Sequence, residues 1–79
     1  MVYTLGTLTL SDGDQYTAAV GTAWAELYSD NPAVVQVGSV YENGGVYCCS
    51  FTARREGSAN VYARVNGAWQ LFAVVTVLP

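Results

Sequence analysis

The sequence predicts an all-β domain, from a strand-forming composition, regularly spaced turn signals and the lack of helical periodicity. Its 79 residues are rich in Val, Thr and Tyr, and β-branched and aromatic residues favour pleated strands. Turn-forming clusters recur roughly every 8 to 14 residues, the spacing of a sandwich or barrel. No segment keeps its apolar residues at helical spacing. The chain length allows one small domain, residues 1–79.

Turn signals separate the predicted strands. They are Ser11–Asp14, Ser29–Pro32, Glu42–Gly45, Arg54–Gly57 and Asn66–Gly67. Asn-Gly is the strongest two-residue hairpin signal, because both positions accept a positive φ. The strands predicted between the turns are Val2–Leu10, Gln15–Val20, Ala23–Tyr28, Val34–Val37, Val46–Ala53, Ser58–Val65 and Ala68–Leu78. A single helical turn near Ser29–Ala33 is the most helix that the pattern allows.

Alternation along the strands assigns their faces. In Ser58–Val65 the core face is predicted to be Ala59, Val61, Ala63 and Val65. In Val46–Ala53 the apolar face is Tyr47, Cys49, Phe51 and Ala53, so Cys49 faces the core and Cys48 faces outward. The last strand is apolar on both faces, whereas a sandwich strand normally keeps one face in water. Either a partner covers its second face, with Phe72 and Val74, or the first strand or a loop does.

Charge and residue types exclude several functions. Charged residues make up 11% of the chain, the net charge is −3, and His is absent. Three Arg residues are too few to build a nucleic-acid-binding patch. Without His, the commonest general base and transition-metal ligand is missing. No apolar run is long enough to cross a membrane, and the N-terminus lacks the features of a signal peptide.

The two cysteines, Cys48 and Cys49, are adjacent, so on a strand their side chains point to opposite faces. A bond between them would require a distorted backbone, and two free thiols are expected. The alternative is a disulfide from one of them to another chain in an oxidising environment.

Several motifs occur in a characteristic order over Leu10 to Val77. They are Gly13–Tyr16 before an early strand, Trp24, Ser29–Val37, Thr52–Ala63 and Val74–Val77. This order resembles the bacterial immunoglobulin-like domains of group 2. The resemblance implies an immunoglobulin-like antiparallel β-sandwich of about seven strands, with no catalytic activity and no cofactor. It also implies that Trp24 lies in the core. Gly57 suits a positive φ between two strands.

The remaining candidates for chemistry have simpler structural interpretations. The cysteines have no His to activate them. Asp12 and Asp14 fit a turn better than a Ca²⁺ site, which needs six or more oxygen ligands. The Arg54–Glu56 cluster is expected to be a solvated tip, or a contact with an acidic neighbour. We therefore expect no enzyme, cofactor or metal.

The sequence favours a virion protein that decorates or accompanies a bacteriophage capsid or tail. The observations are an initiating Met without a leader, an end just after the last strand, low charge and the doubly apolar last strand. The alternative is an excised module of a bacterial adhesin, located outside the cell at its surface. An enzyme inhibitor using the loop Val40–Tyr47 is a third, weaker reading.

In either main reading the partner is a protein: a capsid, a tail or a neighbouring module. A homo-oligomer is compatible with the same features, whereas nucleic-acid binding and membrane insertion are not expected. Tyr and Trp are enriched at interfaces because they bury a large area and keep a polar tip. The predicted interface residues are Tyr41, Tyr47, Cys48, Phe72 and Val74.

Overall fold

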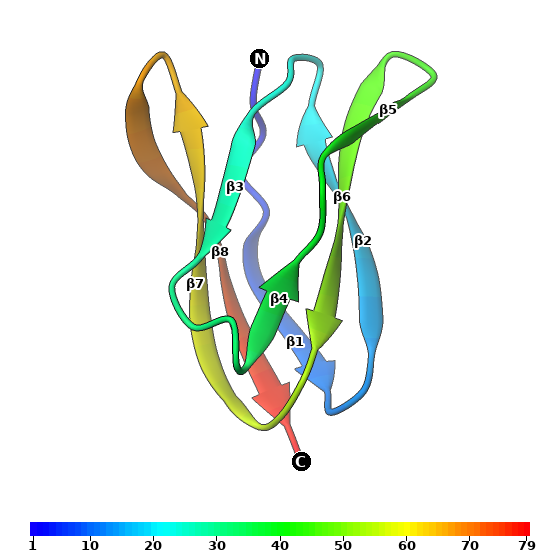
Figure 1. Cartoon of the computed structure of the whole chain (residues 1–79), viewed down its shortest axis with the longest axis vertical. Coiled ribbons are helices and arrows are strands. Elements are labelled where there is room, and N and C mark those ends of the chain that lie inside the picture. Colours follow the sequence, from blue (N-terminus) through cyan, green and yellow to red (C-terminus); the bar gives the residue numbers. More distant parts are fainter.

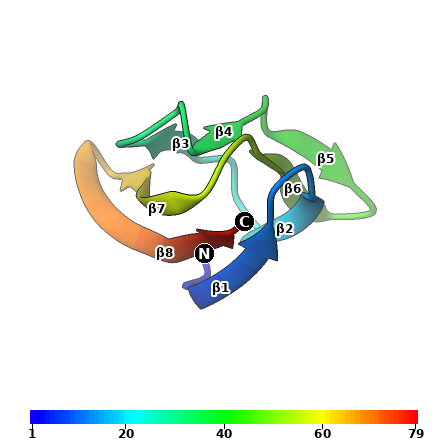
Figure 2. The ribbon, with the colours of Figure 1, turned by 90° about the horizontal axis from the view of Figure 1, so that it is seen from below.

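The computed structural model describes all 79 residues and contains eight strands in two sheets (Figure 1). The strands are β1 Gly6–Ser11, β2 Gln15–Gly21, β3 Glu26–Ser29, β4 Val35–Val37, β5 Tyr41–Asn43, β6 Val46–Ala53, β7 Gly57–Val65 and β8 Ala68–Leu78. One sheet has the order β1-β8-β7-β3 and the other β2-β6-β4, with β5 also paired to β6. Figure 2 looks along the strands and shows the two sheets facing each other. The predicted β-sandwich is confirmed, and no helix that could cross a membrane is present.

The first strand differs from the prediction in length and direction. It begins at Gly6, and Val2 forms only an isolated bridge with Gly21. β1 pairs with β8 in parallel, from Gly6 opposite Ala73 to Ser11 opposite Leu78. No hairpin joins these two strands, so nothing in the connection requires them to run antiparallel.

An additional strand, β5, arises at the turn signal Glu42–Gly45. Both β4 and β5 lie on the same side of β6, with Val37 opposite Phe51 and Tyr41 opposite Cys48. The β4–β5 segment contains one more residue than the β6 segment that it faces. The two strands are therefore halves of one edge strand, interrupted by a bulge.

The local turns follow the sequence signals. In the β7–β8 hairpin, Asn66 has φ 51° and Gly67 has φ 80°, as a two-residue Asn-Gly turn requires. After β3, the amides of Val34 and Val35 both donate to the carbonyl of Asn31 at 3.0 Å. This is the predicted single turn near Ser29–Ala33.

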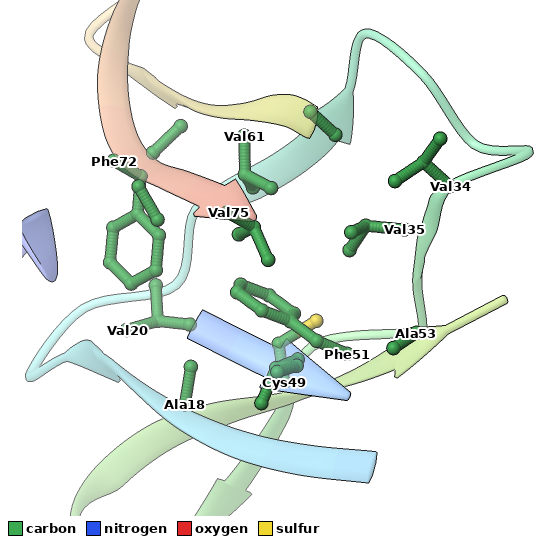
Figure 3. Close-up of a cluster of buried hydrophobic side chains, with 14 of the residues drawn as sticks. Ala18, Val20, Val34, Val35, Cys49, Phe51, Ala53, Val61, Phe72 and Val75 are labelled. Atoms are coloured by element: carbon green, nitrogen blue, oxygen red, sulfur yellow. The ribbon is translucent and has the colours of Figure 1, made fainter. Parts of the chain in front are cut away.

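The core is one cluster of 16 buried apolar residues contributed by both sheets. The predicted inner faces of β6 and β7 are confirmed at six positions, whereas Tyr47 and Val65 are only half-buried. The six buried residues are Cys49, Phe51, Ala53, Ala59, Val61 and Ala63. Figure 3 shows Phe72, Val61 and Val75 of one sheet across from Val20, Cys49 and Phe51 of the other. The rings of Phe51 and Phe72 meet edge to face, with centroids 6.3 Å apart, a favourable aromatic geometry.

A β-bulge in β8 decides which of its residues face the core. Val61 lies opposite Ala73 and Tyr62 lies opposite Leu71, so Phe72 is an extra residue in β8. Such a bulge redirects the side chains on one side of it. Phe72 is only 1% exposed, so the prediction that it faces outward is wrong. Leu71 turns outward instead.

Trp24 is also placed differently from the prediction. It precedes β3 and is 62% exposed, whereas its neighbour Ala25 is buried. The aromatic volume between the sheets comes instead from Phe51 and Phe72. The expectation that Trp24 lies in the core is therefore wrong.

Candidate interaction surfaces

The outer face of β3, β7 and β8 carries two rows of large side chains across the three strands. Glu26, Arg64 and Trp69 are register neighbours in the first row. Tyr28, Tyr62 and Leu71 form the second row in the same way. The bulge at Phe72 places Trp69 and Leu71 in these rows rather than in the core.

Arg64 lies at the centre of the contacts in this region. Its Nη1 is 3.9 Å from Oε1 of Glu26, and its Cζ is 5.8 Å from the centroid of the Trp69 ring. The Trp69 ring also contacts the Tyr28 ring, with centroids 6.0 Å apart and planes inclined at 57°. A guanidinium beside an indole at this separation makes a cation–π interaction, which helps to orient the Arg64 side chain.

A hollow of about 370 Å³ adjoins this cluster, beside the β7–β8 turn at Asn66 and Gly67. Its lining residues are Trp24, Glu26, Arg64, Asn66 and Gly67. We refer to this hollow together with Tyr28 and Trp69 as the tryptophan face. It combines exposed aromatic rings with a carboxylate, a guanidinium and an amide.

A second hollow, of about 540 Å³, follows the end of β6. It is lined by Pro32, Ala33, Gln36, Arg54 and Arg55, and its lining holds no aromatic side chain. Arg54 Nη1 donates to Oε1 of Gln36 at 2.6 Å. Arg54, Arg55 and Glu56 are all exposed, in agreement with the predicted solvated tip.

The predicted interface residues do not form a single patch. Tyr41 and Cys48 are register partners, with Tyr41 exposed and Cys48 half-buried. Tyr47 packs partly against the core. Val74 lies in the other sheet, between Thr7 of β1 and Asn60 of β7, and Phe72 is in the core.

The thiols and acidic residues occupy structural positions. Burial raises the pKa of the Cys49 thiol, whose Sγ donates to the Gly38 carbonyl at 3.2 Å. Both cysteines are free. Asp14 accepts a hydrogen bond from the Ser11 amide at 2.9 Å, which gives it a role in its turn. No three His, Cys, Asp or Glu side chains gather in a way that could hold a metal ion.

The tryptophan face was not among the predicted interface residues, although the sequence carries a signal for it. The Asn66–Gly67 turn sets the hairpin register and therefore places Trp69 opposite Arg64. Arg64 was already assigned to the outer face by alternation. Counting from the turn therefore places Trp69 outside, whereas counting back from the end of β8 places it inside.

Comparison with known proteins identifies a fold rather than a family. No protein-family model and no curated protein sequence matches the chain. A solved structure that does match is the crystal structure of the S-layer protein SbsC domains 4 and 5, with a TM-score of 0.73 and 17% sequence identity. The match covers 94% of this chain and 48% of that chain, so this chain spans about half of the solved structure. At this identity the likeness shows the fold alone.

Proposed function

We propose that the chain is a non-catalytic structural module of a bacterial cell-surface protein, joined end to end with neighbouring modules. The observation that carries this proposal is the fold match, which covers nearly all of this chain and about half of a two-domain fragment of a surface-layer protein. The chain is thus the size of one domain in such a pair. This favours the surface-protein reading over the virion reading.

The positions of the two termini support a serial arrangement. The N-terminus lies at one end of the sandwich and the C-terminus at the other (Figure 1), along an axis with an extent of 34 Å. A preceding and a following module could therefore be attached without folding the linkers back along the domain.

The immunoglobulin-like, group 2 type of the domain is part of the same proposal. Its support is the place of the motif residues in the fold. Asn31 accepts the two turn hydrogen bonds after β3, Gly57 has φ 143°, and Ala59 and Ala63 are buried between the sheets.

The proposal is tested with an antibody raised against the purified domain. We expect it to label intact, unpermeabilised source cells. On a denaturing gel of the cell envelope, we expect it to detect a polypeptide much longer than 79 residues. A signal confined to the interior of the cells would contradict the proposal.

The same antibody separates the second candidate, a protein that decorates a phage capsid or tail. The low charge and the apolar, partly exposed outer face of β8 favour that candidate. It predicts a band of 8.4 kDa that co-purifies with phage particles. That band, without surface labelling of cells, would replace the module reading with the virion reading.

A further inference from the structure

We propose that the tryptophan face binds a neutral carbohydrate. The proposal concerns a ligand site and goes beyond the structural role proposed above. It rests on the exposure of the aromatic rings, on the unused hydrogen-bonding groups beside them and on the balance of charge in the hollow.

The aromatic rings are presented to solvent by the backbone. Trp24 is 62% exposed, Tyr28 55% and Trp69 46%. Large aromatic side chains usually bury most of their surface, so several exposed together mark an interaction surface. The bulge at Phe72 directs the Trp69 ring to the outer face of the sheet, and the Phe72 ring fills the core instead.

The polar groups beside the rings retain free donors and acceptors. At 3.9 Å, the Arg64–Glu26 contact is longer than a hydrogen bond. Both side chains are about half exposed, at 50% and 53%. The Trp69 ring and Glu26 hold the guanidinium in place, while most of its five N–H donors stay available. Asn66, in the same lining, adds an amide.

The charges favour a neutral ligand. The hollow contains one guanidinium and one carboxylate, so an anion drawn to Arg64 would be repelled by Glu26 and by the net charge of −3. A cation drawn to Glu26 would be repelled by the Arg64 guanidinium, which lies 3.9 Å from that carboxylate and already lies over the Trp69 ring. Hydroxyl groups can accept from Arg64 and donate to Glu26 at the same time. A ligand with many hydroxyls and apolar C–H faces for stacking on the rings is a sugar.

A protein partner fits the site less well. A stable interface buries about 800 Å² on each side, with charged residues depleted at its centre. Here the ion pair lies within the aromatic cluster, and covering it with an apolar surface would cost the hydration of both charges. A sugar replaces that hydration with hydrogen bonds to its hydroxyls.

The test uses the 79-residue chain on an array of neutral, sulfated and uronic-acid oligosaccharides, followed by titration of the strongest neutral binder. The two tryptophans of the chain, Trp24 and Trp69, both belong to the proposed site. Intrinsic tryptophan fluorescence therefore reports on this site alone. We expect saturable binding, with a dissociation constant raised about tenfold or more by W69A and by R64A.

The matched control is Y41A, which removes an exposed aromatic residue from the other sheet. It should bind like the unmodified chain, and all variants should keep their melting temperatures within a few degrees. If W69A alters stability, R64A provides an independent variant of the same site. Loss of affinity in Y41A equal to that in W69A would refute the assignment to the tryptophan face.

Three further outcomes would overturn the proposal. One is binding to no glycan on the array. Another is binding only to anionic glycans, abolished by Arg55→Ala rather than R64A, which would move the site to the second hollow. The last is concentration-dependent self-association that W69A abolishes, which would make the face a contact between copies. None of these results affects the cell-surface labelling experiment, so the two proposals can fail separately.

Discussion

The substitution Gly57→Ala tests how the turn after β6 packs on the rest of the domain. Gly57 has φ 143°, a conformation that L residues rarely adopt, and an added Cβ would lie 2.9 Å from Cγ2 of buried Val34. Backbone strain of this kind costs about 1–3 kcal/mol, and overpacking of a core contact costs about 1–3 kcal/mol. The loss of flexibility in the unfolded chain offsets about 0.4–1 kcal/mol. These ranges together give a net loss of about 1–5 kcal/mol in the free energy of unfolding, centred on about 3 kcal/mol.

The assay is urea denaturation of the unmodified chain and its variants, with thermal melting as a second measurement. For a domain of this size the loss corresponds to a melting temperature lower by about 10 to 25 °C. Gly13→Ala is the matched control, because Gly13 also has a positive φ, 89°, but no atom lies within 4 Å of an added Cβ. The Gly13→Ala variant should therefore lose the stability that backbone strain costs, without the further loss caused by a steric clash.

A double variant separates the two terms further. Val34→Ala removes the Cγ atoms that an added Cβ at Gly57 would meet. The combined Val34→Ala and Gly57→Ala variant should therefore lose less stability than the two single variants predict together. If Gly57→Ala unfolds within about 0.5 kcal/mol of the unmodified chain, the reasoning about both the strain and the contact is refuted.

Three further predictions test the core, the buried thiol and the charged tip. Phe72→Ala should lower the free energy of unfolding by about 3–5 kcal/mol, whereas Leu71→Ala should cost about 1 kcal/mol or less because Leu71 is 47% exposed; equal urea midpoints would contradict the bulge. The raised pKa of Cys49 means that, as pH rises, the unfolded chain loses this proton before the folded chain does. The contribution of the Cys49 thiol to the free energy of unfolding is therefore fully present below the pKa that this thiol has in the unfolded chain. It is lost as the pH rises through the higher pKa of the folded chain. In melting curves between about pH 7 and 10, Cys49→Ala should show a smaller decline, and an unchanged decline would assign the effect to other groups. Arg55→Ala should change stability by less than about 0.5 kcal/mol, and a large loss on urea denaturation would show that the exposed tip is packed.

The sequence predicts correctly those parts of the fold that depend on residues close together in the chain, such as uninterrupted alternation along a strand or a two-residue turn. Alternation holds along all of β7 and β6, so the inward direction of Cys49 and Val61 follows from the pattern alone. The Asn66–Gly67 turn is equally local, since it depends on which residues tolerate positive φ. These features require no knowledge of the partner strands.

The parts that the sequence missed depend on pairing across strands. Alternation cannot place Phe72, because the bulge appears only when β8 is aligned against β7. Alternation counted from the hairpin turn predicts that Leu71 points outward, whereas alternation counted back from the end of β8 predicts that Leu71 points inward, like Ala73. That disagreement is itself the sequence signature of a bulge. Trp24 was misplaced for a different reason, since its place was inferred from a resemblance and not from its neighbours.

The candidate site follows the same division. Cys48 was expected to point away from the core, and it lies half-buried opposite exposed Tyr41 in the register of β5 and β6. Glu26, Arg64 and Trp69 come together only through the register of three strands. A group of residues from separate strands cannot be recognised from spacing along the chain.

The parallel pairing of β1 with β8 has a mechanical consequence for a domain held at both ends. The first and last strands lie side by side and run in the same direction, while the chain ends emerge at opposite ends of the sandwich (Figure 1). Backbone hydrogen bonds join them from the Leu5 amide, which donates to Phe72, to the Asp12 amide, which donates to Leu78. Tension between the termini therefore pulls along this ladder and shears its bonds together instead of opening them one at a time. A load applied in this direction meets the resistance of the whole strand pair.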